Sequence, residues 1–264
     1  MAIKVAVGSC SSPGRVRATN QDWLGDFASA DDGPDQGRLF VLADGMGGEA
    51  GGEIASRLAV DVVGKTYFER PSEKPAEALE YSMMAANETI HAQATASTEL
   101  RRMGTTCTAL VLRDSSAWVA HVGDSRAYRV RNGIAAPLTT DHSLADRGRA
   151  YAHVLTRALG VQPKVQVDIT SAPVQAGDIF LLCSDGLWGQ VSDPDIGDIV
   201  KSEPDSEIAS RRMVDLANAH GGPDNISALL VRVERVDRAS WVRAAARAVW
   251  RALAKYSLPT RSSV

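Results

Sequence analysis

The chain has 264 residues, of which 44% are hydrophobic, so it can bury a sizeable core as one large domain, with or without an appendage. Its net charge of −3 and pI near 6.0 give no global signal of nucleic-acid binding, and no nucleic-acid partner is expected. Three cysteines, no recognisable signal peptide and no run near the roughly 20 apolar residues of a spanning helix predict a cytoplasmic protein.

The first elements are predicted from apolar runs and their spacing. Residues 2–9 and 37–43 are apolar enough for strands, and a polar segment separates them. Apolar residues recur at helical spacing over residues 53–68. A second helix is predicted over residues 75–97, because Pro75 suits the first turn of a helix.

The next block is rich in β-branched and aromatic residues, which is typical of strands. The predicted strands are residues 105–112, 118–122, 127–130, 165–169, 179–183 and 226–233, and the predicted helices are residues 194–201 and 206–219. Because helix pairs are segregated from runs of strands, the pattern predicts an α+β layered fold.

The carboxy-terminal segment differs from the rest of the chain. Basic residues recur there at four-residue spacing, namely Arg243, Arg247, Arg251 and Lys255. On a helix they would form one stripe opposite an apolar face, so residues 237–264 are predicted to be a basic amphipathic appendage to a domain of residues 1–236. The appendage could pack on the domain, or residues 239–256 could bind an acidic partner or a membrane surface.

Asp44 stands where an apolar run meets a glycine-rich turn. The run of residues 39–43 is long enough for a buried strand and too short for a helix, and five glycines follow within residues 45–52. Glycines let backbone atoms approach an ion or a phosphate closely. Taken alone, the stretch fits a ligand-binding turn and a helix-capping turn equally well.

The same local pattern recurs at three further aspartates. Asp124 and Asp185 each follow a predicted strand, and Asp224 lies just before the last one. Each could singly be a turn or cap residue. Brought together, however, these carboxylates would repel one another unless a cation lay among them. The candidate ligands are oxygen donors without a zinc-type motif, so the pattern favours Mg²⁺ or Mn²⁺ over zinc.

An ordered series of motifs makes a family resemblance specific. The series is residues 14–22, Asp44-Gly45-Met46-Gly47-Gly48, Gly104-Thr105-Thr106, Gly123-Asp124-Ser125-Arg126, Asp141-His142-Ser143, residues 155–160, residues 184–188 and residues 222–227. In this order it resembles the bacterial metal-dependent protein phosphatases of type 2C over residues 5 to about 234. A single motif is weak, whereas the ordered set is specific.

The resemblance implies a four-layer α-β-β-α sandwich, in which two antiparallel sheets are flanked by helix pairs and a metal centre lies at one edge. The implied metal ligands are Asp22, Asp44, the carbonyl of Gly45, Asp124, Asp185 and Asp224. Asp44 would bridge two core ions, and Asp124 with Asp185 would hold a looser third ion. Asp22 would bind metal directly or orient water from outside the first ring of ligands.

The implied reaction is hydrolysis of phosphoserine or phosphothreonine on proteins by metal-activated water, opposing a bacterial Ser/Thr kinase. Asp44 and Asp185 would be the catalytic carboxylates, Arg17 would bind the substrate phosphate, and Asn225 would support the site. The alternative is a non-catalytic pseudophosphatase that binds phosphoproteins. A cysteine-dependent phosphatase is disfavoured, because no arginine completes a Cys-x5-Arg loop after Cys10. A monomer is expected.

Several positions depart from the family pattern. Gln21 replaces a common glutamate, Met46 and Glu49 stand where histidines occur in other members, and Gly189 replaces an aspartate near the third ion. No histidine can be assigned as a general acid by position. The segment from residue 143 to residue 154 is shorter than the usual flap, which predicts an open approach for substrates.

Overall fold

The computed structural model describes residues 3–29, 36–48, 51–144 and 154–236. Strands in the first half are β1 (Ile3–Ser12), β2 (Asp22–Ala28), β3 (Arg38–Met46), β4 (Gly104–Thr105), β5 (Cys107–Arg113), β6 (Ser116–Val122), β7 (Arg126–Arg131) and β8 (Ile134–Pro137). They are followed by β9 (Asp168–Pro173), β10 (Ile179–Cys183) and β11 (Ile226–Val236). The helices are α1 (Gly51–Phe68), α2 (Pro75–Ala96), α3 (Asp185–Trp188), α4 (Asp193–Ser202) and α5 (Ser206–Ala219).

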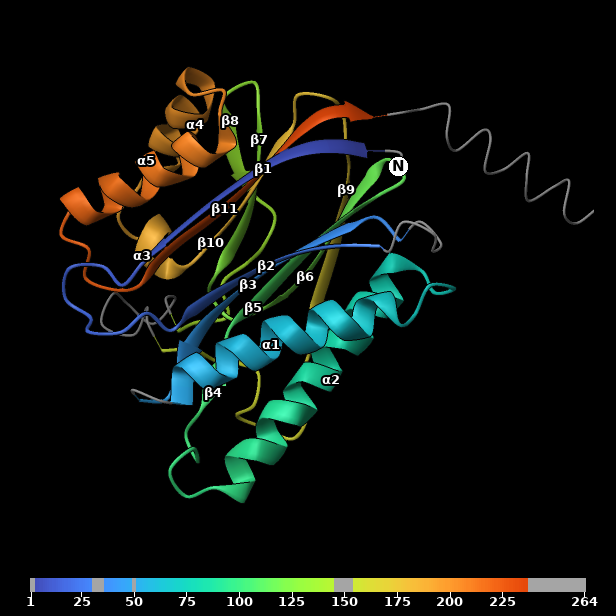
Figure 1. The fold of residues 1–264 in the computed structure, drawn as a ribbon, viewed down its shortest axis with the longest axis vertical. Helices are drawn as coiled ribbons and strands as arrows, with labels where there is room; N and C mark the ends of the chain where they lie inside the picture. Colours follow the sequence, from blue (N-terminus) through green and yellow to red (C-terminus); the bar gives the residue numbers. More distant parts are fainter. Residues whose placement is uncertain (1–2, 30–35, 49–50, 145–153, 237–264) are drawn as a thin grey trace, which may run out of the picture.

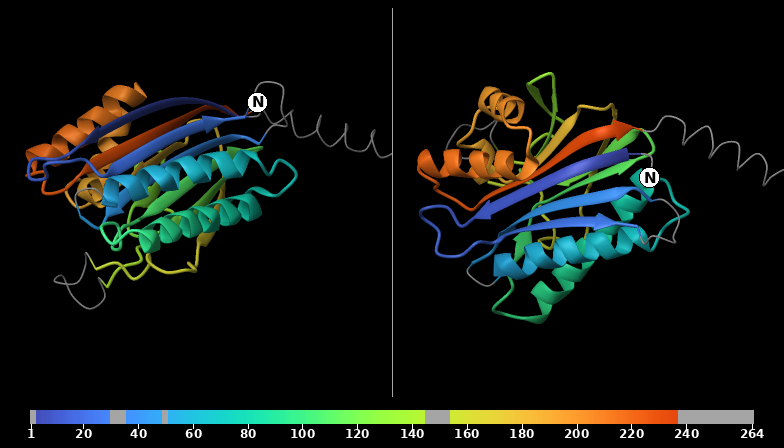
Figure 2. Two further views of the ribbon diagram at one scale, coloured as in Figure 1. Left: turned by 60° about the horizontal axis from the view of Figure 1, so that its bottom comes forward. Right: turned by 45° about the horizontal axis from the view of Figure 1, so that its top comes forward.

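In this part of the chain the strands form two antiparallel sheets that pack face to face (Figure 1). One sheet has the order β1-β11-β10-β7-β8, and the other has the order β2-β3-β5-β6-β9 with β4 paired to β3. Helices α1 and α2 cover the outer face of the β3 sheet, and α4 and α5 cover the outer face of the β11 sheet. The turned views in Figure 2 show the same succession of layers. The predicted four-layer sandwich is therefore confirmed.

Strand β3 contributes side chains to two hydrophobic clusters, one on each of its faces. Leu39, Val41 and Ala43 belong to the core beneath α1 and α2, whereas Phe40 and Leu42 belong to the core between the sheets. All five are fully buried, because alternate side chains of a strand project to opposite faces and both faces of β3 are covered. An uninterrupted apolar run is what such a doubly covered strand requires.

The predicted elements are largely present, with three omissions. Strand β2 was placed in a polar segment, and β8 and α3 were not predicted. Strand β2 has the sequence Asp-Trp-Leu-Gly-Asp-Phe-Ala and is only partly buried, so it lacks the apolar run that marked β3. Strand β8 and helix α3 each have four residues, too few to display a period.

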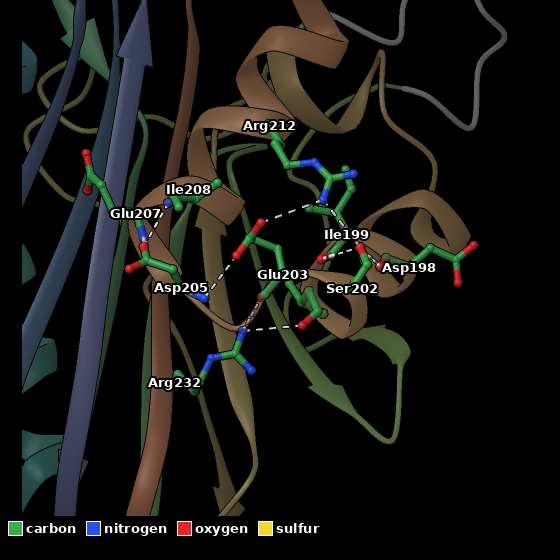
Figure 3. A network of polar contacts seen from close by, with 10 residues as sticks. Asp198, Ile199, Ser202, Glu203, Asp205, Glu207, Ile208, Arg212 and Arg232 are labelled. Atoms are coloured by element: carbon green, nitrogen blue, oxygen red, sulfur yellow. Dashed lines mark hydrogen bonds and ion pairs between the residues drawn. The ribbon is translucent and has the colours of Figure 1, made fainter.

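Helices α4 and α5 are tied to the sheet by polar contacts at their junction (Figure 3). Arg232 of β11 donates from Nη2 to the carbonyl oxygens of Val200 at 3.3 Å and Glu203 at 3.0 Å. The Asp205 carboxylate accepts from two backbone amides at the start of α5, as an N-cap does. These contacts satisfy free backbone groups at the end of α4 and the start of α5.

Several sequence predictions concern residues outside the described part of the chain. These are the appendage of residues 237–264, with the domain boundary that it defines, the short segment over residues 145–153, and Glu49. No helix within the described ranges combines the length and apolarity that crossing a membrane requires.

Candidate metal centre

The centre of the candidate site is a pair of facing aspartates. Strands β2 and β3 are antiparallel, and their register sets Asp22 directly opposite Asp44. Like charges directly opposite each other on neighbouring strands are destabilising. Asp44 lies within β3, which continues to Met46, so it is not at the strand end that the apolar run suggested.

The backbone of Asp44 is fixed by hydrogen bonds to two threonines, Thr105 and Thr106. Its amide donates to Oγ1 of Thr106 at 2.9 Å, and its carbonyl oxygen accepts from the Thr106 amide and from Oγ1 of Thr105, each at 2.8 Å. Next along the strand, Gly45 has no room for a side chain, because a Cβ there would lie 2.1 Å from the carbonyl oxygen of Gly52. The sequence predicted a role for Gly45 but none for these threonines.

Asp22 is almost fully buried, with 5% of its surface exposed. The Ser184 hydroxyl donates to its Oδ2 at 2.8 Å, whereas Oδ1 is buried and has no hydrogen-bond partner within the described structure. Burial, together with the charges of Asp185 and Asp224, raises the pKa of Asp22 to about 7. A buried carboxylate oxygen without a donor is a position that a cation could satisfy.

Asp124 is brought to the same edge by the turn that joins the two sheets, and Asp185 is brought there from the β11 sheet. Asp124 lies in the turn between β6 and β7, and Asp185 is the first residue of α3, directly after β10 and Ser184. Burial, followed by the charges of Asp185 and Asp141, raises the pKa of Asp124 to about 7. The Asp124 carbonyl accepts from the indole of Trp188 at 2.9 Å, which links its turn to α3.

Asp224 completes the group of predicted carboxylates. It lies just before β11, and its Oδ2 accepts a hydrogen bond from Nη2 of Arg17 at 2.7 Å. Asn225 holds the loop that carries Arg17: its Oδ1 accepts from the Gln21 amide at 2.9 Å, and its Nδ2 donates to the carbonyl of Thr19 at 2.8 Å. The guanidinium of Arg17 remains about half exposed at this edge.

The electrostatics show that these carboxylates form one cluster. Burial raises the pKa of Asp44 well above its ordinary value, and the charges of Asp22, Asp185, Asp124 and Asp224 raise it further. Within the described ranges, however, no three His, Cys, Asp or Glu side chains converge in a geometry that could hold a metal ion. Ionised carboxylates repel one another and Arg17 holds Asp224, so the cluster is spread rather than convergent.

The donor set nevertheless fits a hard divalent cation. All the side chains in the cluster are carboxylates, and the buried Oδ1 of Asp22 has no partner within the described structure. Burial, followed by the charges of neighbouring carboxylates, raises the pKa values of Asp22, Asp44 and Asp124. Oxygen ligands of this kind suit Mg²⁺ or Mn²⁺. The residues present therefore fit the ions that the sequence predicts.

The positions that depart from the family pattern have structural roles of their own. The Gln21 side-chain amide donates to the carbonyl of Gly48 at 2.7 Å, a bond that a glutamate could not donate. Gly189 caps α3, and its amide donates to the carbonyl of Asp185. The rings of His121 and His142 lie against each other, with centroids 4.7 Å apart and planes tilted by 41°. Burial lowers the pKa of both, that of His121 to about 4.

Sequence reasoning also missed the residues that brace Asp124. Arg126 makes two hydrogen bonds to the Asp141 carboxylate, at 2.9 and 2.7 Å, and its guanidinium stacks over the Trp188 ring. His142 accepts from the Gly123 amide, and its own amide donates to the Gly123 carbonyl. All of these lie in motifs of the resembling series, but spacing alone gave no indication of what each contacts.

Comparison with known proteins identifies the family of the chain. The family model described as protein phosphatase 2C matches residues 14–231. The serine/threonine phosphatase stp of Listeria monocytogenes is 36% identical over 83% of this chain and 92% of its own length. A structure of PppA, a regulatory component of the type VI secretion system in Pseudomonas aeruginosa, is 34% identical with a TM-score of 0.77, over 88% of this chain and 99% of that one.

The catalytic domain of the Ser/Thr protein phosphatase PstP, solved in complex with two manganese ions, is 34% identical. It superposes with a TM-score of 0.76 over 87% of this chain and 98% of that one. Both the match to the family model and the identity to the curated relative cover most of the chain. The chain belongs to the protein phosphatase 2C family.

Proposed function

We propose that the chain hydrolyses phosphoserine and phosphothreonine in proteins, at a divalent-metal centre built on Asp44. The observation that carries this proposal is the crowding of carboxylates from both sheets at one edge, where burial and mutual repulsion raise the pKa values of Asp22, Asp44 and Asp124. Such a cluster is costly unless cations neutralise it. The intact set of carboxylates argues against the pseudophosphatase alternative.

Each residue has a proposed part. Asp44 would bridge two core ions, Asp185 and Asp224 would hold one of them, and the Gly45 carbonyl would hold the other. Asp22, which faces Asp44 across the two strands, would bind metal or orient water. When bound, the ions supply positive charge and Lewis acidity for phosphate-ester hydrolysis by water.

Asp124 and Asp185 are proposed to hold a third, weaker ion. This assignment is supported by the pKa of Asp124, which is raised by burial and then by the charge of Asp185. Gly189, where an aspartate would add a ligand, offers no side chain, which favours weak binding. Manganese and magnesium both suit the donors.

The oligomeric state, the cellular compartment and the opposing enzyme are also proposals. We propose that the protein acts as a monomer in the cytoplasm and opposes a bacterial Ser/Thr kinase; the free state of Cys10, Cys107 and Cys183 is consistent with a reducing compartment. For residues 239–256 both sequence-based alternatives stand, packing on the domain or binding of an acidic partner or membrane surface.

Phosphate release from a phosphothreonine peptide tests the function directly. Activity is expected with Mn²⁺, should disappear with a chelator, and should return when Mn²⁺ is added back. Asp185→Asn should be inactive under all three conditions, whereas Asp198→Asn, an exposed change on α4, should behave as the wild type. Peptide binding without phosphate release by the wild type would support the pseudophosphatase instead.

Arg17 gives a second prediction. Its exposed guanidinium, paired with Asp224 at 2.7 Å, is placed to bind a phosphate with two parallel hydrogen bonds. Arg17→Ala should lower kcat/KM for a phosphothreonine peptide by about 10- to 100-fold, because hydrogen bonds to charged groups contribute about 1.5–3 kcal/mol. Arg15→Ala, on the same loop, is the matched control, and equal losses in both variants would contradict the assignment.

A further inference from the structure

A groove lies beside the candidate metal centre, at the end of β3. It has a volume of about 440 Å³, and Met46, Leu155, Arg157, Val161, Lys164 and Val165 are among the residues that line it. We call it the Met46 groove. Its size is that of a site for one or two side chains of a ligand.

The groove borders the strand that carries Asp44. Asp44 and Met46 are two residues apart on one strand, so their side chains project from the same face. Met46 pairs with Gly104 of β4, next to the pairing of Gly45 with Thr105. A ligand bound at Asp44 through one residue could therefore reach the groove with a neighbouring residue.

The outer wall of the groove is fixed to the same strands. Thr105 and Leu159 exchange two backbone hydrogen bonds, of 3.1 and 2.8 Å, which attach the loop of residues 155–166 to β4. The side-chain tips of Met46 and Val161 both approach Gly104, where each would lie 2.9 Å from an added Cβ. Glycine at position 104 lets these two side chains form an apolar floor.

The apolar floor is partly exposed to solvent, so a bound peptide could contact it. Val161 is 51% exposed. Exposed apolar side chains beside a polar site are a common feature of binding surfaces. The floor therefore suits an aliphatic side chain of a bound peptide.

The charge of the groove is positive. Arg157 is engaged, because its Nη1 donates to Oδ1 of Asp168 at 2.6 Å. Lys164 is exposed, and the described residues offer it no ion-pair partner. Lys164 is therefore the cation available to a ligand, and an acidic side chain is the complementary group.

We propose that the Met46 groove binds the segment of a phosphoprotein substrate next to the phosphorylated residue, and that Lys164 selects an acidic side chain in that segment. The inference rests on the proposed function, because it places the phosphorylated residue at Asp44. Lys164 acts on substrate choice and takes no part in hydrolysis.

Matched phosphothreonine peptides test the groove. Each pair carries Glu or Lys at one of the three positions on either side of the phosphothreonine, and kcat/KM is measured with Mn²⁺. The wild type should prefer Glu at one or more positions by about three- to fivefold, through a lower KM, which is the scale of an exposed ion pair. Lys164→Glu should reverse this preference.

Two controls separate the possible outcomes. Lys201→Glu makes the same charge change on an exposed residue of α4 and should leave the preference unchanged. Hydrolysis of para-nitrophenyl phosphate, which has no peptide chain, should stay within twofold of wild type in both variants. A wild type without any preference, or a preference that persists in Lys164→Glu, would overturn the groove proposal alone. Absence of para-nitrophenyl phosphate hydrolysis by the wild type would overturn the proposed function as well.

Discussion

Asp44→Asn should lower kcat/KM for a phosphothreonine peptide by at least about a thousandfold, a loss of about 4 kcal/mol of transition-state stabilisation. Asp44 lies at the centre of the carboxylate cluster, and the charges of four other aspartates act on it. An amide keeps the shape of the side chain but removes the negative charge that would bridge two cations. Phosphate release at saturating Mn²⁺ is the measurement.

The same substitution should stabilise the metal-free protein. Burial and the charge of Asp22, which faces Asp44 across β2 and β3, raise the pKa of Asp44 well above its ordinary value. The folded state must therefore hold a proton there or carry an unfavourable charge, and an amide removes this cost. A gain of about 1–2 kcal/mol would raise the Tm by roughly 2–8 °C for a domain of this size. Activity and stability should therefore change in opposite directions, as expected where charges are kept for function at a cost in stability.

Thermal unfolding in the presence of a chelator measures this effect. Asp61→Asn, an exposed change on α1 where the aspartate lies 3.9 Å from Arg57, is the control and should shift the Tm by less than about 2 °C. An Asp44→Asn protein that keeps wild-type activity would contradict the bridging role. A lower Tm in the chelator would contradict a destabilising effect of Asp44 on the metal-free protein.

The layers of the fold could be predicted because the sequence carries their periodicity. The apolar run of residues 39–43 marked a doubly covered strand, and the helical spacing over residues 75–97 marked α2 almost to its ends. Strand β2 could not be predicted in the same way. Its apolar residues are interrupted by Gly25 and by two aspartates on one face, Asp22 and Asp26, and it is a strand because it pairs with β3 along its length.

The candidate site likewise contains residues that the sequence could identify and contacts that it could not. Four of its aspartates have a local signature, a carboxylate beside a strand and a glycine or turn, so the sequence could identify Asp44, Asp124, Asp185 and Asp224. Asp22 lacks this signature and was predicted only through the family resemblance. Their supporting contacts join distant positions: Ser184 and Asp22 are 162 residues apart, and Asn225 and Gln21 are 204 apart. Spacing within one sequence cannot reveal such pairs, because they exist only after the two sheets have packed together.

The pH dependence of metal binding gives the second large effect, because Mn²⁺ should bind much more tightly as pH rises from 6 to 7.5. In the metal-free protein the pKa values of Asp22 and Asp124 are each raised to about 7, so protons occupy these carboxyls below that pH. Mn²⁺ requires the ionised form and must displace the protons. Each displaced proton changes the apparent Kd by about tenfold per pH unit, so an overall change of at least tenfold is expected.

The stability of the metal-free protein should also depend on pH, because the pKa values of the same carboxyls change on folding. A carboxyl whose pKa is raised on folding binds more protons in the folded state, so its contribution is complete below the unfolded pKa near 4 and is lost as pH rises through about 7. The metal-free protein should therefore lose stability between pH 4 and 7 through these groups. Excess Mn²⁺ should restore it, by about 3–4 kcal/mol at 100 to 1,000 times its Kd.

Titration calorimetry in two buffers of different ionisation enthalpy counts the protons released, and thermal unfolding at pH 6 and pH 7.5 measures the stabilisation. The Tm gain from a fixed Mn²⁺ concentration should be larger at pH 7.5 than at pH 6. In Asp22→Asn the number of released protons should fall, because one of the two carboxyls no longer titrates. An affinity that does not change between these pH values would show that Asp22 and Asp124 lie outside the metal centre.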